Sequence, residues 1–170
     1  MVDANQVLSL EQAARLARRR EDCHLDWFEE PFPKPDIESY VQLAKRTEIP
    51  LTAGEREFGV QGFRRLVAAR AISVVQPDLL RVGGVTGWRL AAGLAEINLL
   101  RIAPHFYREY DLHLAASRPH TIAIESFDWL DSLLEQQFEV RDGLAHVPDR
   151  PGFGVTFKPE AIREYRYQLG

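Results

Sequence analysis

Short, largely apolar runs alternate along this chain with longer stretches in which apolar residues recur every three or four positions. The short runs have the length of strands and are WFEEP, LTAGE, AISVVQPD, LLRIAPH and TIAIES. The longer stretches have the period of amphipathic helices and cover residues 9–22, 37–46, 60–69, 88–97 and 110–116. Ser9 and Gln12 form a capping box before the first helix, and Asp36 is placed to cap the second. The pattern predicts an α/β fold in which helical crossovers join parallel strands.

The C-terminal part of the chain has a different pattern. The segment FEVRDGLAHV predicts a β-hairpin at Asp142-Gly143, because an Asp-Gly pair readily adopts the positive φ angles of a two-residue turn. The segment KPEAIREYRYQL predicts a final helix over residues 158–169. No linker-like stretch divides the 170 residues, so we expect one domain, with the hairpin and the last helix over residues 136–170.

Composition narrows the class of protein. Hydrophobic residues make up 45% and charged residues 27%, as in an ordinary globular protein. A net charge of −4 gives no reason to expect nucleic acid or an anionic membrane as a partner. Cys23 is the single cysteine, which excludes an internal disulfide and favours a reducing compartment. Residues 1–20 are too charged for a signal peptide and no run has the length of a membrane span, so we expect a cytoplasmic protein.

Polar residues stand directly after six strand-like runs, at nearly regular intervals. They are Asp3, Glu29, Glu55, Asp78, His105 and Glu125, separated by 26, 26, 23, 27 and 20 residues. A strand, a helix and two loops occupy about this length in a repeated βα unit. The six side chains are therefore predicted at the carboxyl ends of consecutive parallel strands, where barrel enzymes carry their active sites.

The first three of these residues, Asp3, Glu29 and Glu55, are carboxylates on neighbouring predicted strands. Oxygen ligands of this kind are those that a hard cation such as Mg²⁺ prefers. Such a site also leaves coordination positions for water and for a bidentate substrate. We therefore expect the three acids to be metal ligands.

The next residues in the series have the chemistry of a base and an acid. Asp78 and His105 end adjacent predicted strands, so that the carboxylate can bond one imidazole nitrogen. That bond fixes the tautomer and makes the other nitrogen a proton acceptor near neutral pH. Glu125 is suited to act as an acid or as a hydrogen-bond donor at an oxyanion, provided that burial raises its pKa.

Six segments resemble, in the same order, the mandelate racemase-like branch of the enolase superfamily: VDANQ, WFEEP, TAGE, QPDLLRVGGVTGW, IAPHF and IES. The similarity spans almost the whole chain and extends to VPDRPGFGV. It implies a partial (β/α) barrel of about six strands, the C-terminal part of a mandelate racemase/muconate lactonizing enzyme. It also implies Mg²⁺ on the three acids, a His105–Asp78 base pair and Glu125 as the electrophile. Asn5 and Arg81 match polar positions beside the metal and the base, where we expect them to bind substrate.

The resemblance also implies a reaction, the Mg²⁺-dependent abstraction of a proton α to a carboxylate with stabilisation of the enolate. Residues 71–82 contain no lysine and the third ligand is Glu55, which favours the racemase and acid-sugar dehydratase members over the muconate-lactonizing ones. The segment APHFYREYDLHLAAS is most similar to dehydratases of hexarate-type acid sugars. We expect a hydro-lyase whose substrate is a small carboxylate, an acid sugar, with a racemase or epimerase of a 2-hydroxy acid as the alternative.

Asp3 matches the end of the third strand of the family's barrel. On this match, strands one and two, the N-terminal capping domain and its Lys-x-Lys segment lie outside the 170 residues, since a full barrel needs about 250 residues. A ligand on a frayed terminus costs ordering entropy, so we expect weak Mg²⁺ binding and little activity from this chain alone. We also expect a homo-oligomer, most simply a dimer, that covers an unpaired sheet edge.

Two hypotheses from other classes of protein remain open on the sequence. A metal-independent glycosidase would use paired acids on a barrel face, such as Glu29 with Glu55 or Glu125, and would keep its activity in a chelator. A truncated half-barrel that serves only for binding or assembly would need none of these side chains for catalysis.

A second metal hypothesis rests on one helix. His105, Glu109 and His113 have the i, i+4, i+8 spacing of ligands on a single helical face. Pro104 instead favours a strand-to-loop position for His105, and the HExxH signature is missing. We therefore rank this hypothesis below the strand-end site.

Overall fold

A parallel sheet forms the centre of the molecule. The computed structural model describes residues 1–34, 36–136 and 138–167. The sheet has five strands in chain order: β1 (Val2–Asp3), β2 (Phe28–Glu29), β3 (Leu51–Ala53), β4 (Val74–Val75) and β5 (Arg101–Ile102). All four neighbouring pairs are parallel, which confirms the predicted α/β fold and is consistent with part of a (β/α) barrel.

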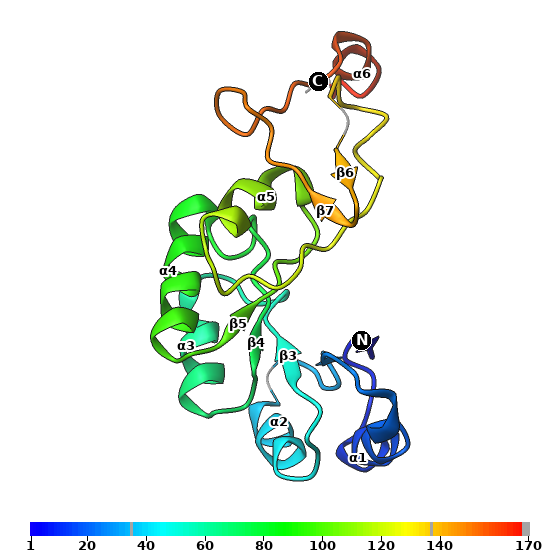
Figure 1. Cartoon of the computed structure of the whole chain (residues 1–170), viewed down its shortest axis with the longest axis vertical. Coiled ribbons are helices and arrows are strands. Elements are labelled where there is room, and N and C mark those ends of the chain that lie inside the picture. The colour runs from blue at the N-terminus through cyan, green and yellow to red at the C-terminus, as the bar shows by residue number, and fades with distance from the viewer. Residues whose placement is uncertain (35, 137, 168–170) are drawn as a thin grey trace.

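Each strand is followed by a helix, and the helices lie along one side of the sheet (Figure 1). They are α1 (Leu10–Arg18), α2 (Ile37–Ala44), α3 (Val60–Ala68), α4 (Gly84–Ile97) and α5 (Arg108–Ala116), with a short 3₁₀ turn at Glu21–Cys23. The capping box of Ser9 and Gln12 is present, and the Asp36 carboxylate accepts the Ser39 amide. Because the chain forms a 3₁₀ turn after Arg20, α1 is shorter than the predicted 9–22.

Helix α4 begins at Gly84, four residues before the predicted start. Gly83 and Gly84 have φ angles of 102° and 70°, which only glycine adopts without strain, so the chain turns directly from the end of the β4 segment into the helix. Gly87 lies so close to the previous turn that a Cβ there would come within 2.0 Å of the Val82 carbonyl oxygen. The glycine-rich motif is therefore a tight strand-to-helix connection.

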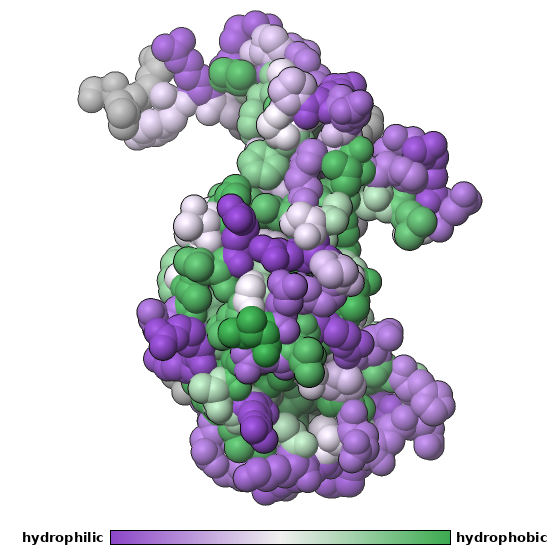
Figure 2. All heavy atoms as spheres, turned by 60° about the vertical axis from the view of Figure 1, so that its left-hand side comes forward, coloured by the Kyte–Doolittle hydropathy of each residue, from purple (hydrophilic) through white to green (hydrophobic). Residues whose placement is uncertain are grey.

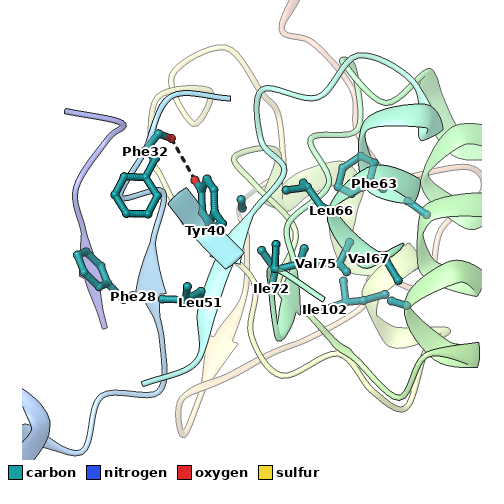
Figure 3. Close-up of a cluster of buried hydrophobic side chains, with 14 of the residues drawn as sticks. Phe28, Phe32, Tyr40, Leu51, Phe63, Leu66, Val67, Ile72, Val75 and Ile102 are labelled. Carbon is teal, nitrogen blue, oxygen red and sulfur yellow. Dashed lines mark hydrogen bonds between the residues drawn. The ribbon is translucent and has the colours of Figure 1, made fainter. Parts of the chain in front are cut away.

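The hydrophobic core lies between the helices and the sheet. Figure 3 shows its centre, where side chains of the strands meet those of α2 and α3 and the Tyr40 hydroxyl donates to the Phe32 carbonyl oxygen over 3.1 Å. Trp88 on α4 is fully buried in the same cluster. The opposite face of the sheet carries a smaller apolar group of Trp27, Val74 and Ala103. Successive residues of a strand point to opposite faces, so Trp27 and Glu29 share this second face.

The predicted sixth strand, TIAIES, is present only as a single parallel bridge between Ile102 and Thr121. Ile102 donates its amide to the His120 carbonyl oxygen, and Ile122 donates to the Ile102 carbonyl oxygen, but no ladder follows. The expected barrel of about six strands therefore has five paired strands and one reduced to a bridge.

The C-terminal part extends away from the sheet (Figure 1). It contains the predicted hairpin, β6 (Val140–Arg141) and β7 (Leu144–Ala145), with positive φ angles at Asp142 and Gly143. The last helix, α6 (Pro159–Glu164), is shorter than the predicted 158–169, whose last two residues lie outside the described part. Polar and apolar residues are interspersed over the face seen in Figure 2. None of the described helices is long and apolar enough to cross a membrane.

Candidate active site at the strand ends

The six predicted strand-end residues all lie at the carboxyl ends of the strands or of the segment that follows β5. Asp3 and Glu29 are direct partners in the ladder between β1 and β2. Asp78 and His105 form a parallel bridge just beyond β4 and β5. Glu55 lies two residues beyond β3. The regular spacing therefore places these side chains at the carboxyl ends of neighbouring strands, as expected for a βα repeat.

Asp78 and His105 form a hydrogen-bonded pair. The Nδ1 atom of His105 is 3.0 Å from Oδ2 of Asp78, and because a carboxylate only accepts, Nδ1 is the donor, so that in the neutral imidazole Nε2 carries the lone pair. Oδ1 of Asp78 accepts the amides of Leu80 and Arg81 at 2.9 Å each, which fixes the carboxylate. Burial disfavours the Asp78 anion, but the bonds from His105 and the Arg81 amide outweigh it and lower the Asp78 pKa.

The free nitrogen of His105 faces two further carboxylates. Nε2 is 3.3 Å from Oε2 of Glu55 and 3.8 Å from Oε2 of Glu125. Burial disfavours the imidazolium, but the Asp78 bond and the charges of Glu55 and Glu125 outweigh it and raise the His105 pKa above its ordinary 6.5. The histidine is thus able to hold and release a proton at Nε2 near neutral pH.

Glu125 lies beside His105 in a half-buried position. Its Oε2 accepts the amide of Phe106 over 2.8 Å. Burial is the main cause that raises its pKa, and the charges of Glu55 and Asp3 add to it. A raised pKa favours the neutral carboxylic acid, which can donate a hydrogen bond.

Glu29 is the most buried of the three predicted metal ligands, with 1% of its surface exposed. Its two oxygens accept from Trp27 Nε1 over 2.8 Å and from Gln76 Nε2 over 2.7 Å. Burial, and to a smaller extent the Asp3 carboxylate, raises its pKa. No Lys, Arg or His within the described residues forms an ion pair with Glu29.

The three acids fit a hard cation by their chemistry. They supply oxygen donors only, and the carboxylates of Asp3 and Glu29 are neighbours that a cation would neutralise. In the part of the chain that the structure describes, however, no three His, Cys, Asp or Glu residues are arranged as a metal site. Glu55 is instead turned toward His105. The ligand assignment of Asp3, Glu29 and Glu55 therefore stays a prediction.

Asn5 and Arg81 also lie near the carboxyl ends of the strands. The Asn5 amide donates to Asp3 Oδ1 over 2.8 Å, and its side-chain oxygen accepts from Arg56 over 2.7 Å. Arg81 donates from Nη1 to the Glu55 carbonyl oxygen over 2.9 Å. Both predicted substrate-binding residues thus contact the loops that carry the acids.

The sequence analysis missed Glu30, which directly follows Glu29. Its side chain is 3% exposed and accepts from Gln6, and Arg56 Nε lies 3.8 Å away. Burial raises its pKa to about 7. Glu30 was not predicted because the spacing of the strand-end residues selected only one acid of the EEP pair, Glu29. Gln76, which holds Glu29, had a signal in its alternation with Asp78, since residues two apart share a face of a strand.

The helical metal hypothesis is not supported by the geometry. His105 is bonded to Asp78 in the loop before α5. Glu109 pairs instead with Arg108 over 2.9 Å, and His113 Nε2 lies 3.2 Å from the Phe153 carbonyl oxygen. The three side chains therefore face different partners.

The family is shown by comparison with known proteins. The model of the family described as "Enolase C-terminal domain-like" matches residues 1–161. This chain belongs to that family. The L-talarate/galactarate dehydratase of Salmonella typhimurium is 39% identical over 163 residues, 96% of this chain and 41% of the relative. The 3,6-anhydro-alpha-L-galactonate cycloisomerase of Streptomyces coelicolor is 31% identical over 95% of this chain and 45% of its own length.

A solved structure agrees with the sequence relatives. The L-talarate dehydratase of Polaromonas sp. JS666, crystallised with Mg and L-glucarate, superposes with a TM-score of 0.92 at 39% identity. The match covers 96% of this chain and 46% of that protein. The chain therefore spans less than half the length of these relatives.

Proposed function

We propose that this chain forms part of an enzyme that dehydrates acid sugars, by Mg²⁺-dependent removal of a proton α to a carboxylate. The observation that carries the proposal is the Asp78–His105 hydrogen bond, which turns His105 Nε2 toward Glu55 and Glu125 at the carboxyl ends of the strands. The similarity to sugar-acid dehydratases supports the substrate class. Asp3, Glu29 and Glu55 are the residues that would hold Mg²⁺. When bound, the ion would neutralise the charge that develops on the substrate carboxylate.

His105 is the base in this proposal. Its Nε2 takes the α-proton, and Asp78 stabilises the imidazolium that results. Glu125, whose pKa is raised by burial, would donate a hydrogen bond to the developing oxyanion in its protonated form. The imidazolium then returns its proton to the departing β-hydroxyl, so that water leaves and the enol becomes a 2-keto acid. Asn5 and Arg81 orient the substrate hydroxyl groups beside these residues.

Dehydration is favoured over racemisation because one residue, His105, can serve both as base and as acid. Racemisation or epimerisation of a 2-hydroxy acid needs a second base on the opposite side of the substrate. A metal-independent glycosidase would leave the Asp78–His105 pair without a role.

The proposal is tested in a fusion that adds, before Met1, the part of the Salmonella dehydratase that this chain does not span. With Mg²⁺ and an acid-sugar library that includes galactarate, we expect a 2-keto acid product. His105→Asn should lower the rate by a factor of about 10² to 10⁴, whereas His24→Asn on the exposed surface should not. Racemisation without a keto acid, or activity that persists in a chelator, would contradict the proposal. Magnesium binding without turnover would favour a non-catalytic half-barrel.

The proposal includes a homo-oligomer. β1 and the segment at Thr121 lie at the two outer edges of the parallel sheet. An unpaired edge strand is a site of association. Light scattering of the chain at micromolar concentration should give the mass of a dimer. A monomer that unfolds cooperatively would argue against it.

A further inference from the structure

Glu125 is placed beside His105 by a segment that has almost no regular structure. The bridge at Thr121 is the last strand pairing before it. Among the described residues, no backbone-to-backbone hydrogen bond involves residues 123–127. His105, by contrast, donates its amide to the Pro77 carbonyl oxygen over 3.1 Å and bonds Asp78 through its side chain. The ladder that orders the base therefore does not order Glu125, and other contacts must do so.

The start of α5 supplies these contacts. Arg108, the first residue of α5, is only 7% exposed. Its Nη1 donates to Ser126 Oγ over 2.7 Å, its Nη2 donates to Asp131, and its Nε donates to Glu109 over 2.9 Å. Two of the three guanidinium nitrogens thus bond the segment around Glu125, and the third bonds Glu109 on α5 itself.

Charge strengthens this arrangement. Burial disfavours the guanidinium, but the carboxylates of Asp131 and Glu109 outweigh it and keep the Arg108 pKa raised. Hydrogen bonds between charged partners are stronger than neutral ones, and the planar fork of arginine fixes their direction. Removal of Arg108 would also leave the Glu109 and Asp131 carboxylates without the cation that pairs with both.

A second tie comes from Phe106, two residues before Arg108. Its amide bonds the Glu125 carboxylate directly. Its backbone has a φ of 78°, an unusual value for a residue with a side chain, and its ring packs on Phe127 and Trp129 at centroid distances of 5.4 and 5.0 Å. The tie to Glu125 thus comes from the same short stretch that holds Ser126 and Asp131.

We propose that Arg108 is a positioning residue, which fixes Glu125 beside His105 by clamping Ser126 and Asp131 to the start of α5. The catalytic part of this role rests on the proposed function, because that proposal makes Glu125 the hydrogen-bond donor to the oxyanion. The position of Glu125, however, can be measured in the 170-residue chain without any turnover.

The amide proton of Phe106 reports where Glu125 lies, since a bond to a carboxylate moves its NMR signal downfield and protects it from exchange. Glu125→Ala removes the acceptor and defines the signal of the free amide. In Arg108→Met we expect the Phe106 signal to move most of the way to that position. We also expect amide exchange at Ile122 and Asp131, whose amides donate backbone hydrogen bonds, to rise at least about tenfold. Arg108→Lys keeps the charge but not the fork, and should give an intermediate result.

Arg118→Met is the matched control, because Arg118 pairs with Glu96 over 3.0 Å just beyond the C-terminal end of α5. It should leave the Phe106 amide unchanged. If Arg108→Met does not fold, Ser126→Ala and Asp131→Ala each remove one hydrogen-bond acceptor of Arg108 and should shift the signal part of the way. A folded Arg108→Met with the wild-type Phe106 signal, or the same shift in Arg118→Met, would overturn the proposal.

The fusion enzyme then separates the clamp from the proposed function. If Arg108 positions Glu125, Arg108→Met lowers kcat by a factor of about 10 to 10² with little change in KM, and Arg108→Lys recovers part of the loss. An inactive wild-type fusion would count against the proposed function, while the NMR result would still decide the position of Glu125. A rise in KM with kcat unchanged would overturn the catalytic part of the proposed role of Arg108.

Discussion

The sheet with its helices and the C-terminal part are stabilised in different ways. Residues 1–105 contain the five parallel strands and helices α1 to α4, and their core includes fully buried side chains such as Phe63 and Trp88. Beyond α5, most described residues are exposed or half-buried, and a cavity of about 490 Å³ lies among Glu109, Phe138 and Phe153. Asp78 and His105 are joined by backbone pairing as well as by their side chains, whereas the Glu125 carboxylate accepts from the Phe106 amide and its neighbour Ser126 accepts from Arg108. A disruptive substitution in the first region should destabilise the whole fold, whereas one in the second region should loosen only its surroundings.

A pair of tryptophans gives the largest expected contrast between the two regions. Trp88→Ala empties a fully buried site, and we expect it to lower the free energy of unfolding by about 3–5 kcal/mol. Trp129 is 61% exposed and its ring packs on Phe106 and Phe127, so Trp129→Ala should lower the free energy of unfolding by about 1 kcal/mol or less. Urea unfolding followed by circular dichroism measures both values. Equal losses would show that the C-terminal part belongs to the same cooperative core.

Asp111 on α5 lies where the two regions meet, and it gives a smaller effect that depends on pH. Its side chain is 1% exposed, and neither carboxylate oxygen has a hydrogen-bond partner among the described residues. Burial, and then the charges of Asp78 and Glu109, raises its pKa from 3.8 to about 8. Between these values the native state holds a proton that the unfolded state has released. The free energy of unfolding therefore falls as the pH rises from about 4 to about 8.

Asp111→Asn should remove this part of the pH dependence. We expect the variant to be more stable than the wild type at pH 8 by about 1–3 kcal/mol, with little difference at pH 4. Denaturant unfolding at several pH values tests this, and Asp22→Asn, at an exposed carboxylate, is the control. If the two variants show the same pH dependence, the Asp111 carboxylate is not held neutral in the folded chain.

Two glycines give the smallest effects and sharpen the comparison. A Cβ at Gly93, inside α4, would meet no other heavy atom within 4 Å, so Gly93→Ala should raise the free energy of unfolding by about 0.5–1 kcal/mol. Gly143 lies in the turn of the hairpin with a φ of 76°, so Gly143→Ala should destabilise the hairpin by about 1 kcal/mol. Thermal unfolding should detect the first change, whereas the second should appear as faster amide exchange in β6 and β7 only. Loss of global stability in Gly143→Ala would contradict the separation of the two regions.

The sequence determined the alternation of strands and helices. It also determined which polar residue follows the carboxyl end of each strand. The period of apolar residues reports which positions are buried, and the interval between polar residues reports the length of a βα unit. This was enough to bring Asp78 next to His105, because neighbouring parallel strands align their carboxyl ends. The Asp-Gly hairpin was equally predictable, since its turn depends on local dihedral angles.

Only the tertiary structure decided how these residues are held. Glu29 is bonded by Gln76, which lies 47 positions further along the chain, and Glu125 is tied to the start of α5. The burial of Glu30 and the clamp at Arg108 likewise depend on residues more than 15 positions away. The sixth strand was reduced to a bridge although TIAIES has the pattern of a strand. A local pattern records propensity and burial, whereas such pairings depend on which distant groups the packed core brings within hydrogen-bond reach.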